Sequence, residues 1–170
     1  DGKSRSAIEE QIRDKELQDV VELRGKIPNE EVPKFYSEVD VIVLPRLGFP
    51  VCEIVPALKP LEAMSYGKCV ISSDVGPAKE LISHGENGLL FKKSNVRELV
   101  KILVSLKKSP ETIREIGRAG KEMVASEREW GKLLSDVSAT IHSIQFLTHR
   151  LLLLLLVRSS HHRFFHHLVV

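Results

Sequence analysis

The sequence predicts an α/β fold with a doubly wound parallel sheet and a helical C-terminal region. Short runs of β-branched and apolar residues alternate with amphipathic stretches from residue 4 to about residue 108, and turn residues separate them. This alternation is typical of βαβ units. The run at residues 41–44 is apolar throughout, as expected of a strand covered by helices on both faces, so we expect it to be central.

Strand and helix signals follow one another along the chain. Residues 4–16 place Ile8 and Ile12 one helical turn apart. A further helix starts around Pro60, and Gly67 is placed to end it in a left-handed cap. The predicted strands are residues 20–23, 41–44, 69–72 and 89–91. Later helices start at Gly76, Asn95 and Pro110, and the last helical region reaches about residue 144 with a break near residues 126–130.

Length and composition predict one compact domain, over residues 1–145, followed by a low-complexity or aberrant tail, over residues 146–170. A chain of 170 residues with 42% hydrophobic and 28% charged residues is long enough for one core. The formal net charge is only +2 and no dense basic block is present, which argues against a nucleic-acid partner.

Cysteine usage and hydropathy suggest where the protein works. Cys52 and Cys69 have neither CxxC nor metal-ligand spacing, so we expect reduced core thiols and a cytoplasmic location. We see no signal peptide, and the leucine run at residues 151–156 is much shorter than the roughly 20 residues that span a bilayer. The histidine pairs in the tail are weak candidates for a metal site, and we expect none.

Two carboxylates flank the start of the helix near Pro60. Glu53 lies in an apolar loop and Glu62 in the first helical turn. Ligands of doubly wound sheets bind beyond the carboxyl ends of the strands, where helix N-termini suit phosphates and carboxylates accept hydrogen bonds from sugar hydroxyls. The pattern favours a nucleotide sugar, although a solvated loop residue and a favourable first-turn anion explain it as well.

These residues belong to an ordered set of motifs. The set comprises Asp1-Gly2, residues 21–28, Glu31-Val32 with Phe35-Tyr36, residues 40–45, residues 58–64 with Gly67, Gly76-Pro77 with residues 80–82, and Gly85 with residues 87–91. In this order the chain resembles the C-terminal domain of family 4 (group 1) glycosyltransferases over about residues 1–135. The resemblance implies the Rossmann-like C-terminal half of a GT-B fold. It also implies sugar transfer from a nucleotide-diphosphate sugar, with this chain supplying the donor-binding half.

The resemblance assigns roles to the two acids and the loop between them. Glu62 matches the acid that holds the donor ribose hydroxyls. Glu53 matches the catalytic acid that contacts the donor sugar and stabilises the departing glycosyl centre, although eight residues separate it from Glu62, one more than is usual in the family. Ile54 and Val55 would offer backbone N–H groups to the donor phosphate or sugar.

A second group of residues matches the family's nucleotide contacts. Arg24, Gly25 and Lys26 would flank the base, with Gly25 allowing a close approach of the backbone, although an ordinary strand-end turn also explains this glycine. Lys59 is a candidate phosphate ligand, and the alternative is a solvated lysine at a helix start.

The implied reaction is a hexosyl transfer with retention of anomeric configuration. In the family the leaving diphosphate is thought to act as base, so no protein nucleophile is needed, and we find no Ser/His/Asp or Cys/His arrangement that would supply one. The two acids would position the donor and stabilise the departing glycosyl centre. No metal or other cofactor is expected, because the nucleotide sugar is the substrate.

The resemblance also implies that parts of the family fold lie outside this sequence. We expect the first strand of the domain, the N-terminal acceptor-binding domain and an upstream basic pair to be missing, which leaves an exposed sheet edge. A fragment of this kind should bind donor weakly or not at all and be inactive alone. Peripheral membrane association of the full-length protein is compatible with this picture.

Two other readings stay open. A related GT-B enzyme, such as a nucleotide-sugar epimerase or a phosphorylase, would carry extra acid/base residues or a pyridoxal-binding lysine in its other domain. A non-catalytic nucleotide-sugar-binding or scaffolding module would keep its function after Glu62→Ala.

Overall fold

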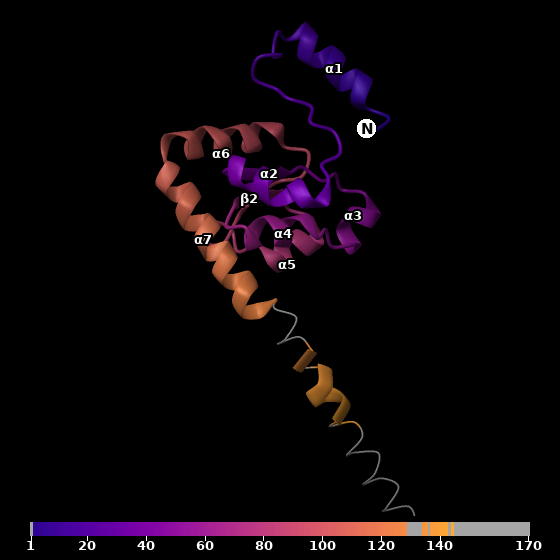
Figure 1. Ribbon diagram of the computed structural model, residues 1–170, viewed down its shortest axis with the longest axis vertical. Coiled ribbons are helices and arrows are strands. Elements are labelled where there is room, and N and C mark those ends of the chain that lie inside the picture. Colours follow the sequence, from indigo (N-terminus) through magenta and orange to yellow (C-terminus); the bar gives the residue numbers. More distant parts are fainter. Residues whose placement is uncertain (1, 129–133, 136, 143, 145–170) are drawn as a thin grey trace, which may run out of the picture. The chain divides into compact units, whose positions relative to one another are not determined.

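In the described part of the chain, three parallel strands form a sheet in the order β1-β2-β3. Figure 1 shows the helices that surround its central strand, β2. The computed structural model describes residues 2–128, 134–135, 137–142 and 144. The strands are β1 (Val41–Leu44), β2 (Cys69–Ser73) and β3 (Leu89–Phe91). Val41 pairs with Cys69 and Ile71 pairs with Leu89, both in parallel register. The predicted α/β fold with a parallel sheet is confirmed.

Helices connect the strands, and several begin and end where the sequence predicts. The Gly67 φ is +71°, and its N–H donates to the Met64 carbonyl at 2.8 Å where α4 ends. The Asn95 side chain accepts from the Glu98 N–H at 3.2 Å and caps α6. The helices are α1 (Arg5–Asp14), α2 (Val32–Glu38), α3 (Pro50–Ile54), α4 (Lys59–Ser65), α5 (Gly76–Leu81), α6 (Val96–Lys108) and α7 (Pro110–Glu127).

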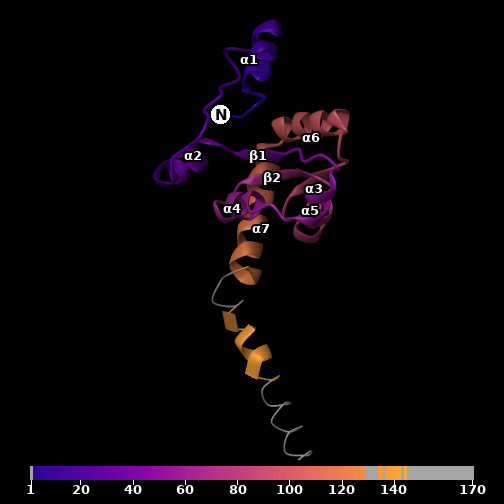
Figure 2. The same cartoon turned by 90° about the vertical axis from the view of Figure 1, so that its right-hand side faces the viewer.

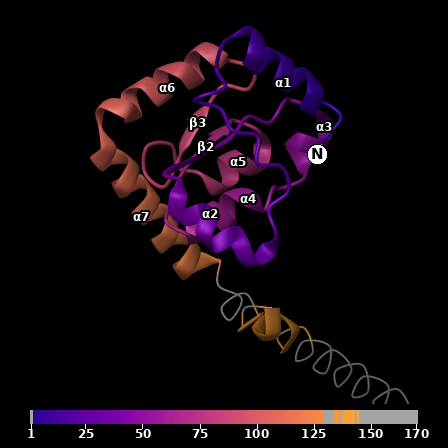
Figure 3. The same cartoon turned by 45° about the horizontal axis from the view of Figure 1, so that its top comes forward.

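The sheet lies between two helical layers, as a doubly wound fold requires. Figure 2 shows α6 on one face of the strands, and α4 and α5 on the other. In Figure 3, α6 and α7 meet at a corner with β2 and β3 on its inner side. The core on that side contains Cys69, Ile71, Phe91, Leu106 and Ile116. The opposite face of β2 packs against α4, whose Ala63 and Met64 are fully buried.

Two strand predictions are wrong. Residues 20–23 form no strand, and Val20 is 76% exposed, because no described strand lies beside this segment to pair with its N–H and C=O groups. The run Val41–Leu44 is not central: β1 pairs only with β2 among the described strands, and its residues are half-buried, whereas all five residues of β2 are buried. Among the described strands β2 is central and β1 is an edge strand, and the apolar composition of β1 reflects the helices that cover its faces.

The chain divides into two compact units, Asp1–Lys121 and Glu122–Val170. In the second unit, residues 134–135, 137–142 and 144 are helical. The predicted tail over residues 146–170, with its leucine run and histidine pairs, lies outside the described residues, and the boundary at residue 145 stays a prediction. Within the described part of the chain, no helix combines the length and apolarity needed to cross a bilayer.

Cys69 is the first residue of the central strand, β2. It is fully buried, and burial raises its pKa to about 11. Because thiolate is the reactive form, we expect Cys69 in a Cys52→Ser variant to react with Ellman's reagent at pH 8 at least about a hundredfold more slowly than in denaturant. Cys52 is only half-buried, so it does not share the predicted core position. Fast labelling of the native variant would contradict the burial of Cys69.

Candidate functional site

The Glu53 carboxylate lies where the carboxyl ends of β2 and β3 meet. Glu53 is on α3, a short helix where the sequence predicts a loop; Pro50 stands in its first turn. Glu53 Oε2 accepts from the Gly76 N–H at 3.0 Å, just after β2 ends. Glu53 Oε1 accepts from Lys93 Nζ, two residues after β3 ends. This is the sheet edge at which ligands of doubly wound folds bind.

The partners of Glu53 are themselves fixed to the sheet. The Lys93 N–H donates to Asp74 Oδ1 at 2.7 Å, and the Asp74 N–H donates to the Phe91 carbonyl at 2.9 Å. A Cβ on Gly76 would lie 2.6 Å from the Glu53 carbonyl oxygen, so only glycine allows α3 and α5 to approach this closely. The end of β2, the end of β3 and α3 are thus joined through one polar cluster.

Electrostatics keep Glu53 ionised. The hydrogen bond from Lys93 and the Gly76 N–H hold the pKa of the Glu53 carboxyl below its usual range. The same ion pair raises the pKa of Lys93. Because the Glu53 pKa is lowered on folding, its contribution to stability is present above the unfolded pKa and is lost as the pH falls through the folded pKa.

The loop after Glu53 is exposed. Ile54 is 76% exposed and Val55 49%. The Val55 N–H donates to the Val51 carbonyl at 2.9 Å, so it is engaged within α3 in this structure and a phosphate would have to displace that contact. The Val55 carbonyl accepts from Arg46 Nη1 at 2.8 Å, which ties the loop to the end of β1. The ligand contacts of Ile54 and Val55 stay predictions.

Glu62 lies near a stacked pair of tyrosines. It is half-buried in the first turn of α4, while Lys59 at the start of that helix is exposed. Burial, and then the charge and hydrogen bond of Glu62, raise the pKa of Tyr36. Tyr36 is 5% exposed and stacks on Tyr66 with ring centroids 4.5 Å apart. The Tyr36 side chain therefore lies close enough to Glu62 to interact with its carboxylate.

The alkaline titration of Tyr36 tests this contact. In a Tyr66→Phe variant Tyr36 is the sole tyrosine, and we expect its absorbance at 295 nm to titrate above the ordinary value of about 10. A raised folded pKa gives stability that is complete below the unfolded pKa and is lost as the pH rises through the folded pKa. Adding Glu62→Gln should lower the midpoint. An unchanged midpoint would show that Glu62 does not act on Tyr36.

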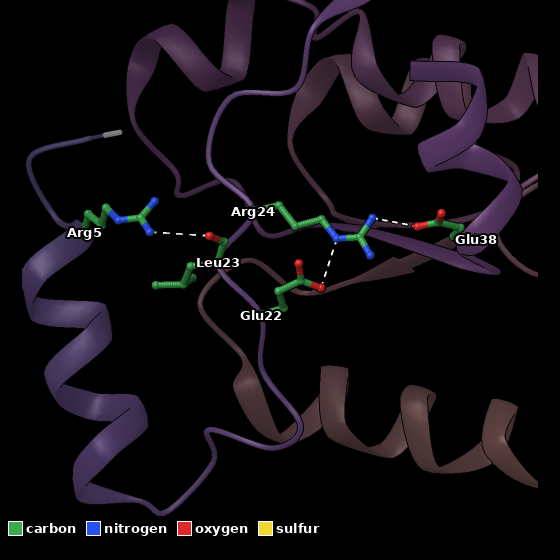
Figure 4. Close-up of polar contacts among 5 residues, drawn as sticks. All are labelled: Arg5, Glu22, Leu23, Arg24 and Glu38. Carbon is green, nitrogen blue, oxygen red and sulfur yellow. Dashed lines mark hydrogen bonds and ion pairs between the residues drawn. The ribbon is translucent and has the colours of Figure 1, made fainter. Parts of the chain in front are cut away.

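Arg24 is held between two carboxylates (Figure 4). Its Nε donates to Glu22 Oε2 at 3.0 Å and its Nη1 donates to Glu38 Oε2 at 2.7 Å. The guanidinium carbon lies 6.0 Å from the centre of the Phe35 ring. Gly25, with φ of +71°, makes the adjoining turn in a conformation that favours glycine.

Two cavities adjoin Arg24. The larger, about 610 Å³, is mainly apolar and is lined by Gly2, Ile8, Leu23, Arg24, Gly25 and Phe35, among others. The smaller, about 310 Å³, includes Lys26 and Glu38 in its lining. Neither cavity is lined by Glu53 or Glu62. The predicted site residues therefore fall into two groups, one at Arg24 and one at the sheet edge.

Helix α2 connects these groups. Phe35, next to Arg24, meets Tyr36 edge-on with ring centroids 5.4 Å apart, and Tyr36 contacts Glu62. Tyr36 was not predicted as a site residue, and neither were Lys93 and Asp74. The last two follow predicted strands, which is the signal that could have identified them.

Comparison with known sequences gives a family match. Residues 1–123 match the family described as glycosyl transferases group 1. The chain is 32% identical over 124 residues to the amylovoran biosynthesis glycosyltransferase AmsK of Erwinia amylovora, covering 68% of this chain and 29% of that protein. The chain thus spans less than a third of the length of this relative.

Comparison with solved structures gives the same fold. Sucrose-phosphate synthase from Thermosynechococcus elongatus superimposes with a TM-score of 0.72 at 26% identity, covering 84% of this chain and 35% of that one. Anabaena HepE, solved in complex with UDP-glucose, superimposes with a TM-score of 0.69 at 20% identity, covering 81% of this chain and 36% of that one. The second likeness concerns the fold alone.

Proposed function

The chain belongs to the group 1 glycosyltransferases, and we propose that it supplies the donor-binding half of an enzyme that transfers a sugar from a nucleotide-diphosphate sugar to an acceptor. The observation that carries the proposal is the Glu53 carboxylate, held ionised at the carboxyl edge of the parallel sheet. A fixed anion at this edge suits both sugar hydroxyls and a developing positive glycosyl centre.

The remaining contacts follow the order of groups in a nucleotide sugar. The base would lie in the larger cavity, beside Arg24 and Gly25, while Lys26 lines the smaller cavity, which shares lining residues with the larger one. The ribose hydroxyls would donate to Glu62, oriented by Tyr36. Lys59, exposed at the start of α4, could reach a phosphate. The UDP-glucose in the HepE complex supports a uridine nucleotide as the first probe.

The proposed chemistry is sugar transfer with retention of anomeric configuration, in which these residues position the donor and stabilise the transition state. Glu53 would hold the donor sugar and stabilise the glycosyl centre as its bond to the diphosphate breaks. The diphosphate leaves and accepts the acceptor's proton, so neither a protein nucleophile nor a cofactor is required. Acceptor binding would come from a second domain, since the chain matches less than a third of AmsK.

Nuclear magnetic resonance tests donor binding, because it detects weak complexes. We expect UDP-glucose or GDP-mannose, titrated into ¹⁵N-labelled chain, to bind with a dissociation constant on the order of 1 mM. The amides of Gly25, Glu62 and Gly76 should shift, and that of Leu103 on α6 should not. If neither ligand shifts the first three amides at about 10 mM, the chain does not bind a donor as proposed.

A further inference from the structure

The ammonium group of Lys93 approaches Glu53 from the far edge of the sheet. We propose that Lys93 is a positioning residue of the donor site, which orients the Glu53 carboxylate so that its free lone pairs face the hydroxyls of the donor sugar. The inference rests on the proposed function, because it assigns Glu53 to the sugar.

Two hydrogen-bond donors hold the Glu53 carboxylate, one at each oxygen. Oε1 accepts from Lys93 and Oε2 accepts from the Gly76 N–H at 3.0 Å. Each carboxylate oxygen has two lone-pair sites, so this arrangement occupies one per oxygen and leaves one on each for a ligand. With only one donor the carboxylate could rotate about its terminal torsion, whose energy minimum is broad. Two donors fix the plane of the carboxylate.

Lys93 is itself fixed, which a positioning residue requires. Its backbone N–H donates to Asp74 at 2.7 Å, and its stem would be 3.1 Å from a Cβ on Gly48. The side chains of Lys93 and Glu53 are 41% and 30% exposed, so a ligand can reach the pair. The lowered pKa of Glu53 and the raised pKa of Lys93 agree with this contact.

The test compares a donor with its nucleotide alone. In the Lys93→Met chain we expect UDP-glucose to bind about threefold more weakly and UDP to bind unchanged, because UDP lacks the glucose that is proposed to meet Glu53. Lys93→Arg should restore most of the affinity. Lys92→Met, which removes the same charge at the neighbouring position, should leave both ligands unaffected.

A double variant shows whether Lys93 acts through Glu53. Once Glu53→Gln is present, Lys93→Met should cause no further loss of UDP-glucose affinity. Additive losses, equal weakening of UDP and UDP-glucose, or wild-type affinity in Lys93→Met would each overturn the positioning role. Absence of binding of both UDP-glucose and GDP-mannose to the wild-type chain would instead overturn the proposed function, and the inference with it.

Discussion

Replacing Gly117 by alanine should lower the free energy of unfolding by about 3 kcal/mol. Gly117 lies in α7 where that helix crosses the turn after α4. A Cβ there would be 2.2 Å from the Gly67 carbonyl oxygen and 3.3 Å from the Cys69 N, which are backbone atoms next to the central strand. Backbone cannot rotate aside as a flexible side chain can, so the helix must move away from the sheet.

Urea unfolding followed by circular dichroism measures this effect. Two variants in the same helix serve as controls. Gly120→Ala should lower the free energy of unfolding by less than Gly117→Ala does, since its Cβ would lie 3.0 Å from the Asn87 carbonyl oxygen. Arg118→Ala, at an exposed position, should change stability by about 0.5 kcal/mol or less. A Gly117→Ala chain as stable as the wild type would mean that α7 does not pack against the turn at Gly67.

Replacing Glu62 by alanine should weaken UDP-glucose binding tenfold or more. A hydrogen bond to a charged group contributes about 1.5–3 kcal/mol, and tenfold corresponds to about 1.4 kcal/mol. The binding of UDP should weaken equally, because both ligands carry the ribose that Glu62 is proposed to hold. This pattern differs from that of Lys93→Met, which should affect UDP-glucose only.

Matched variants separate binding from folding. Glu62→Gln keeps the size of the side chain and should also lose affinity, since the amide offers a poorer acceptor to two hydroxyls. Glu80→Ala removes an exposed carboxylate from α5 and should bind as the wild type. If Glu62→Ala bound UDP as tightly as the wild type, the proposed contact between Glu62 and the ribose would be wrong. That result would favour a module that does not use this acid.

Local signals in the sequence predicted much of the fold. Gly67 and Asn95 act within one helical turn, so the end of α4 and the start of α6 follow from neighbouring residues. The short apolar runs in the sequence likewise predicted β1, β2 and β3 as strands. Glu53 and Glu62 were identified through the family motif, and the structure places each in a defined polar environment.

Features that depend on distant partners could not be predicted. Residues 20–23 have strand composition, but whether they form a strand depends on a neighbour. The edge position of β1 depends on strand order, which its own residues do not encode. Lys93 and Glu53 are forty positions apart in the chain, and only the crossover between strands brings them together. Tyr36 reaches Glu62 in the same way, from a helix that was not predicted.

The most direct test is a crystal structure of the chain soaked with UDP-glucose. It should show a ribose hydroxyl within about 3.2 Å of the Glu62 carboxylate, and a glucose hydroxyl at the same range from Glu53. The uracil should lie in the cavity beside Arg24. A bound nucleotide that contacts neither carboxylate would contradict the assignment of this sheet edge to the donor.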